Sequence, residues 1–170
     1  MNRDFIRSTV QKMAANQCLP DERKSFCNTV WNADQNSMAP LLLELLDDNN
    51  IKVAAEAIGL LLNTKYAEHY LEAVLIKLDG LDNDICMTVS YELARLPYFG
   101  PRVIDPLSKI VKASGSADIR YWAIVALEKS NDKRVLSVLE WCKEHDSGRT
   151  YEGDSVSDRA ASAMASILQN

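Results

Sequence analysis

Apolar residues recur at helical spacing along almost the entire chain. The segment 38–46 shows this most clearly, because its apolar residues follow the i, i+3, i+4, i+7, i+8 pattern of one helical face. Similar stripes predict a first helix over 4–15 and a second that begins at Pro20, whose fixed φ suits a first helical turn. The pattern predicts an all-α protein of ten helices in five antiparallel pairs. The remaining stripes cover 37–48, 51–63, 71–78, 85–96, 103–111, 119–127, 135–142 and 155–168.

One apolar frame recurs in the second helix of successive pairs. Ile51, Ile85 and Ile119 are 34 residues apart, and Val156 follows 37 residues later. A recurring period of this length indicates stacked helical repeats. We therefore expect one domain over 1–170, with a capping helix pair in 1–36 and four repeats in 37–170. The residue before each frame position is a good helix cap, and the expected caps are Asn50, Asp84, Asp118 and Ser155.

The second helices resemble those of HEAT repeats. The resemblance rests on Asn50-Ile51-Lys52 with Ala55, and on Asp118-Ile119-Arg120 with Ala123. It is weaker in the second copy, where Cys86 replaces the basic residue and Val89 replaces the alanine. A tetratricopeptide repeat has the same period, but its Trp-Leu-Gly-Tyr series does not recur here. The resemblance implies a right-handed, armadillo-like α-α superhelix, an α-solenoid whose second helices line a concave surface.

Composition and charge narrow the function classes. The net charge is −5, and the segment 36–80 alone carries three basic and seven acidic side chains. An acidic surface argues against nucleic acid as the partner, because binding to phosphates needs clustered Lys and Arg. The chain shows neither the apolar core of a signal peptide nor an apolar run of membrane-spanning length. We expect a cytoplasmic protein that makes no contact with membranes.

No residue pattern indicates catalysis, a metal or another cofactor. The four cysteines are scattered without CxxC spacing, so buried free thiols are expected. Neither His69 nor His145 has a second ligand at zinc spacing. Glu92 falls on a core row of its helix, where a raised pKa would suit an acid or base. We expect it instead to find a partner such as Arg95 or Tyr91, and we expect no enzymatic activity.

Five side chains are candidate partner-binding residues. At 100° per residue they fall on the arc of the second helices that points away from the core, and Tyr, Arg and Met are enriched at interfaces. Packing of the tyrosines between repeats is the open alternative, and Trp122 is expected to pack. The loop 146–154 offers Arg149 and Tyr151 as contacts, or is a plain solvated loop. The five candidates are Met87, Tyr91, Arg95, Tyr121 and Lys129.

These expectations favour a non-enzymatic protein-binding module. HEAT-like proteins mostly bind other proteins, so the resemblance implies the same here. The most concrete version is a small immunity protein that neutralises a partner toxin by binding its basic domain, as in a toxin–antitoxin pair. The alternatives are a scaffold or regulatory subunit of a larger assembly, and an enzyme like the HEAT-like DNA glycosylases or bilin lyases.

Overall fold

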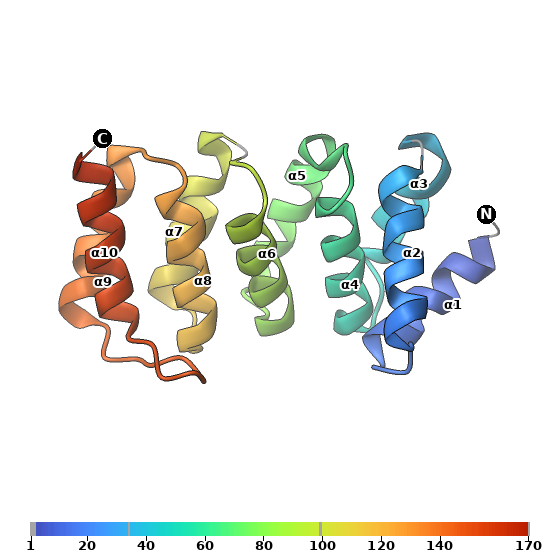
Figure 1. Ribbon diagram of the computed structural model, residues 1–170, viewed down its shortest axis with the longest axis horizontal. Coiled ribbons are helices and arrows are strands. Elements are labelled where there is room, and N and C mark those ends of the chain that lie inside the picture. Colours follow the sequence, from blue (N-terminus) through green and yellow to red (C-terminus); the bar gives the residue numbers. More distant parts are fainter. Residues whose placement is uncertain (1–2, 34, 99, 170) are drawn as a thin grey trace. The chain divides into compact units, whose positions relative to one another are not determined.

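The protein is all-α, as the apolar pattern predicts. The computed structural model describes residues 3–33, 35–98 and 100–169, which form ten α-helices and no strand (Figure 1). None of these helices is long and apolar enough to cross a membrane. The helices are α1 (Arg3–Ala14), α2 (Pro20–Asn32), α3 (Gln35–Leu45), α4 (Ile51–Leu62), α5 (Ala67–Ile76), α6 (Asn83–Arg95), α7 (Ile104–Ala113), α8 (Ala117–Glu128), α9 (Leu136–His145) and α10 (Val156–Gln169). Short 3₁₀ segments precede α7 and α9 and follow α5.

The chain folds into two compact units, Met1–Asp79 and Gly80–Asn170. In the first unit α4 is the central element and contacts α1, α3 and α5. Its composition explains this position, since it is apolar on most faces and eight of its residues are buried. Arg23 of α2 forms an ion pair with Glu56 of α4 (2.8 Å), and Arg7 of α1 pairs with Glu44 of α3 (2.6 Å).

Not every predicted apolar stripe of the first unit is buried. Ile6, Val10 and Met13 of α1 are buried as expected, but Phe5 is exposed and meets the edge of Phe26. Trp31 of α2 is also exposed, although it is a large aromatic residue. The expected start of α3 at Ser37 is wrong, because the helix begins at Gln35 and Ser37 lies within it.

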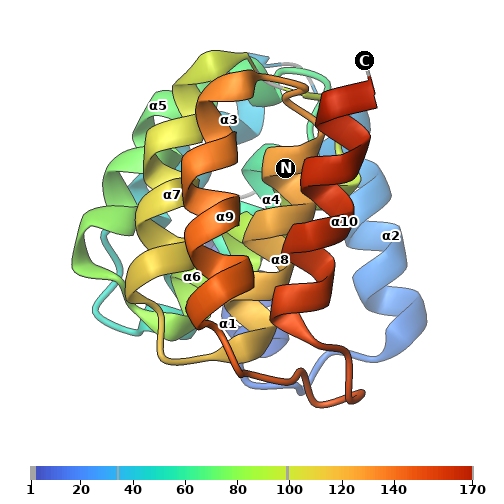
Figure 2. The ribbon, with the colours of Figure 1, turned by 90° about the vertical axis from the view of Figure 1, so that its left-hand side faces the viewer.

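The second unit consists of two layers of helices. One layer holds α6, α8 and α10, and the other holds α7 and α9 (Figures 1 and 2). The helix α8 contacts α6, α7 and α10, so it is the centre of this unit. The residues of the recurring apolar frame lie in the core of this unit. Each frame position in α6, α8 and α10 is buried, and so is the residue four positions after it. These buried residues are Ile85, Val89, Ile119, Ala123, Val156 and Ala160.

The expected helix caps are correct at two positions and wrong at two. Asn50 accepts a hydrogen bond from the backbone N–H of Lys52, and Ser155 accepts one from that of Asp158. In contrast, α6 begins earlier than expected, and Asp82 caps it in place of Asp84. Similarly, α8 begins at Ala117, so that Asp118 lies in its first turn. The carboxylate of Asp118 accepts the backbone N–H of Tyr151 instead (3.0 Å).

Candidate protein-binding site

The helix α6 places three candidate residues on one face. Met87, Tyr91 and Arg95 follow one another at intervals of four residues, which aligns side chains along a helix. Met87 is half-buried, Tyr91 is 38% exposed and Arg95 is exposed. Their accessibility follows from the burial of another face of α6, where Ile85 and Val89 pack into the core.

An aromatic cluster joins α6 to α8. The ring of Tyr91 meets the ring of Trp122 edge-to-face, with centroids 5.0 Å apart and planes at 87°. Tyr121 meets Trp122 in the same manner at 5.6 Å. Edge-to-face geometry is favourable because the positive rim of one ring contacts the negative face of another. The structure thus brings Tyr91 and Tyr121 together through Trp122, and we call Tyr91, Tyr121 and Trp122 the aromatic cluster.

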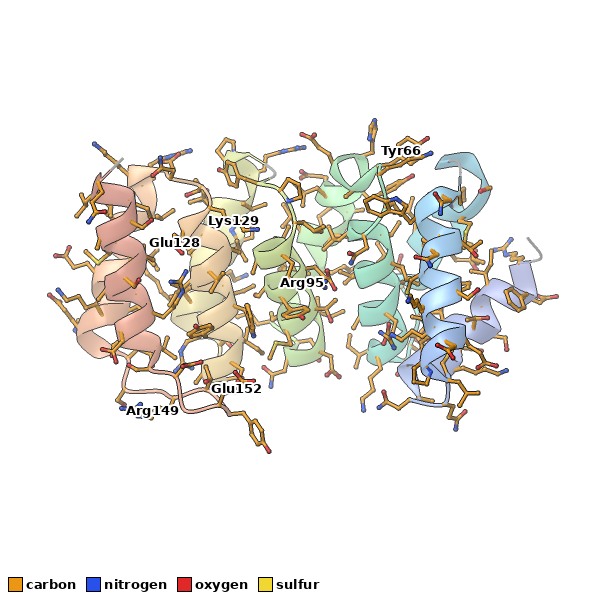
Figure 3. All side chains as sticks on the ribbon, in the orientation of Figure 1. Tyr66, Arg95, Glu128, Lys129, Arg149 and Glu152 are labelled. Atoms are coloured by element: carbon orange, nitrogen blue, oxygen red, sulfur yellow. The ribbon has the colours of Figure 1, made fainter. Side chains whose placement is uncertain are left out.

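Arg95 adds positive charge beside the aromatic cluster. Its guanidinium lies over the Tyr91 ring, 5.2 Å from the centroid, a distance at which the ring quadrupole attracts a cation. Arg95 also forms an ion pair with Glu92 one turn earlier (3.5 Å). The expectation that Glu92 would pair with Arg95 is therefore confirmed. Figure 3 shows Arg95 on α6, with its side chain among the residues of that helix.

Lys129 has a structural partner that the sequence did not reveal. Its ammonium donates a hydrogen bond to the backbone carbonyl of Leu96 (2.6 Å), directly after the last residue of α6. A cation is favourable there because the carbonyls at the end of a helix lack intrahelical partners. Partial burial lowers the pKa of Lys129. Lys129 stays exposed at the end of α8 (Figure 3), but its charge joins α8 to α6.

Trp122 has a larger part in this surface than its sequence position indicated. Expected only to pack, it contacts both tyrosines and remains half-buried, so part of its ring is accessible. Its place directly after Tyr121 gave little indication that the two rings would meet, because adjacent residues of a helix point about 100° apart. The contact depends on how α6 and α8 pack, which periodicity does not specify.

Arg120 fixes the end of α8 that carries the aromatic cluster. Its guanidinium forms two hydrogen bonds with the carboxylate of Asp146, Nε to Oδ2 at 2.5 Å and Nη2 to Oδ1 at 2.7 Å. Its Nη1 donates to the carbonyl of Ser114 (2.8 Å). Ser114 and Asp146 are the C-caps of α7 and α9. One arginine therefore joins three helices, which holds α8 in place beside its neighbours.

Cys86 and Cys142, both buried, have pKa values well above that of an ordinary thiol. Burial raises the pKa of Cys86 to about 11 and that of Cys142 to about 12. Such thiols stay protonated at neutral pH and are poor nucleophiles. Within the residues described, no three His, Cys, Asp or Glu side chains lie close enough together to hold a metal ion.

Comparison with known proteins yields no relative. No family model, no curated protein and no solved structure matches this chain. The function is therefore argued from the surface of the molecule.

Proposed function

We propose that this protein is a non-enzymatic protein-binding module with the architecture of a HEAT-like α-solenoid. In its most concrete form it is an immunity protein that neutralises a toxin by binding it. The observation that carries the proposal is the contact of Tyr91 with Trp122, beside Arg95, on a partly exposed face of α6 and α8. Tyr, Trp and Arg are the residue types most enriched among interface hot spots.

The physical properties of the aromatic cluster suit a protein interface. Aromatic side chains bury much apolar area, and their few rotatable bonds keep the entropy cost of binding low. The edge-to-face contacts with Trp122 further restrict Tyr91 and Tyr121 before a partner arrives. A partner side chain that covers these rings would bury their exposed parts without first ordering them, which favours affinity.

The charge of the chain favours a basic partner. The net charge is −5, so a positively charged protein would be attracted over a distance and associate faster at low salt. A toxin that acts on nucleic acid has such a surface, because it must bind phosphates. A scaffold or regulatory subunit could use the same aromatic cluster, but would bind a permanent assembly instead of a single toxin.

The first experiment is to purify the untagged protein from its source and identify what accompanies it. The affinity of the recovered partner is then measured for Tyr91→Ala and Tyr121→Ala, with Tyr98→Ala as the control because Tyr98 is similarly exposed but outside the aromatic cluster. Each cluster variant should lose about 2 kcal/mol of binding free energy, with its melting temperature nearly intact. The association rate should fall as salt is added.

Two results would contradict the proposal. If both cluster variants lower the melting temperature and bind the partner as tightly as the wild type, the tyrosines are packing residues only. If the partner is a small molecule or an acidic protein, the assignment to a toxin-binding module is wrong. Recovery of a large multi-subunit assembly would favour the scaffold or regulatory alternative.

A further inference from the structure

The segment between α9 and α10 is an ordered hairpin rather than a plain solvated loop. Arg149 and Ser155 form an antiparallel bridge, and the backbone N–H of Thr150 donates to the carbonyl of Asp154 (2.9 Å). The turn closes with a hydrogen bond from Gly153 N–H to the carbonyl of Thr150 (2.9 Å). Gly153 has φ 93°, a conformation that favours glycine. We call residues 149–155 the Tyr151 hairpin.

The base of the hairpin is attached to a buried ion pair. Asp146, with a side chain only 5% exposed, is held by Arg120. Gly148 donates its N–H to the same carboxylate (2.8 Å), and its carbonyl accepts the N–H of Val156. A Cβ at position 148 would overlap the Arg120 guanidinium, so a larger residue there would displace that guanidinium from its place beside Asp146.

The tip is attached separately, to the first turn of α8. Asp118 accepts the backbone N–H of Tyr151, which fixes the tip of the hairpin while leaving the tyrosine ring free of that contact. Tyr151 is 97% exposed, far more than any other large apolar or aromatic residue among those described. An ordered backbone lowers the backbone entropy that binding through this tyrosine would otherwise cost.

The hairpin borders the aromatic cluster. Asp118 precedes Tyr121 and Trp122 by three and four residues on α8, a spacing that places all three on one side of the helix. Figure 3 shows Glu152 below the end of α8 where that helix begins, with Arg149 on the same loop. The Tyr151 hairpin and the aromatic cluster therefore belong to neighbouring parts of the second unit.

The charges around Tyr151 are mainly acidic. Glu152 and Asp154 are exposed on the hairpin itself, and Asp118 and Asp158 lie in the first turns of α8 and α10. The hairpin also carries one basic residue, Arg149, whose guanidinium donates to the carbonyl of Gly153 (2.9 Å). The face of a tyrosine ring also attracts cations. The ring of Tyr151 and the nearby carboxylates would together attract the cationic side chain of an arginine or a lysine.

We propose that the Tyr151 hairpin is a second, preformed contact element that binds an arginine or lysine on the surface of a basic partner protein. This inference rests on the proposed function in protein binding, but it concerns a different set of residues. Tyr151 supplies the ring over which the cation lies, and Glu152 supplies the opposite charge. The Arg120–Asp146 pair holds the hairpin in position.

The test uses a phage-displayed library of random cyclic peptides, selected on the purified wild-type protein and counter-selected on Tyr151→Ser. Lys- and Arg-rich peptides should be recovered. Their affinity should fall by about tenfold or more for Tyr151→Ser and Glu152→Lys, and it should weaken with salt. Tyr98→Ala is the matched control and should bind these peptides as the wild type does, because Tyr98 is exposed but lies outside both the hairpin and the aromatic cluster. Tyr91→Ala is measured beside it, and the hairpin proposal requires a larger loss of affinity for Tyr151→Ser than for Tyr91→Ala.

The proposal is overturned if no Tyr151-dependent peptide is recovered, or if the recovered peptides are acidic or apolar. It is also overturned if they bind Tyr151→Ser and the wild type equally. The melting temperature of Tyr151→Ser should equal that of the wild type, because the ring is solvent-exposed. Loss of binding by Tyr91→Ala alone would assign the peptides to the aromatic cluster and reject the hairpin as their site.

Discussion

Arg120 and Asp146 form a bidentate ion pair that links α8 to the end of α9, with hydrogen bonds of 2.5 and 2.7 Å. Both side chains are largely buried. A buried pair adds little to stability compared with apolar residues of the same shape, but removal of one partner strands the other charge. Arg120 also bonds to Ser114, so its loss would affect the ends of two helices.

Arg120→Ala should therefore destabilise the fold strongly. We expect a loss of about 3–5 kcal/mol in the free energy of unfolding, measured by urea denaturation. Arg134→Ala is the control, since its ion pair with Asp132 (2.6 Å) is largely exposed and such pairs contribute little. Equal, small effects of the two substitutions would show that the Arg120–Asp146 pair does not hold the helices together.

The same pair predicts a pH dependence. Burial alone raises the pKa of Asp146, but hydrogen bonds from Arg120 and Gly148 outweigh it and hold that pKa below its ordinary 3.8. A lowered pKa in the folded state contributes stability above the unfolded pKa, and this stability disappears as the pH falls through the folded value. The stability difference between the wild type and Asp146→Asn should be constant from neutral pH to about pH 5 and narrow below about pH 4.

Urea denaturation of both proteins across this pH range measures that difference. Hydrogen bonds from Arg134 lower the pKa of Asp132 to about 2. Because Asp132 is present in both proteins, its contribution to the pH dependence cancels in the difference. A difference that widens on acidification would mean that the carboxyl of Asp146 is not stabilised in its charged form.

Two serines, one within α6 and one at the cap of α10, should respond oppositely to alanine substitution. Ser90 of α6 is fully buried, and its hydroxyl finds no hydrogen-bond partner among the described residues. Ser90→Ala should leave stability unchanged or raise it by up to about 1 kcal/mol, because an unpaired buried hydroxyl is unfavourable and alanine is the better helix former. Ser155→Ala should cost about 1 kcal/mol through loss of the α10 cap.

Thermal or urea unfolding of the two variants compares them directly. A clear loss of stability in Ser90→Ala would indicate that its hydroxyl is satisfied in solution, for example by a water molecule. An unchanged Ser155→Ala would show that the hydrogen bond to the N–H of Asp158 contributes little.

The cysteines should differ in reactivity. Cys86 and Cys142 are buried, and burial raises the pKa of each thiol. Cys18 and Cys27 are only half-buried, although burial also raises the pKa of Cys27. Pulsed alkylation followed by mass spectrometry should label Cys18 first in the folded protein, and Cys86 and Cys142 only after unfolding. Early labelling of Cys142 would contradict the packing around the Arg120–Asp146 pair.

The sequence by itself determined the helices and most of the buried face of each. Helical periodicity is a local property, so the stripes through Leu71, Leu107 and Leu139 predicted buried residues before any packing was known. The same geometry placed Tyr91 and Arg95 on one accessible face of α6. The repeat architecture and the binding function remain predictions.

Only the tertiary structure decided which residues meet across helices. The roles of Trp122, Lys129 and Asp118 depend on contacts with residues at least 31 positions away from them in the chain. Local periodicity fixes the side of a helix on which a residue lies, but not its partner there. The Tyr151 hairpin is the clearest case, because its attachment to α8 depends on Arg120 and Asp118, which lie on a different helix and far from it in the sequence.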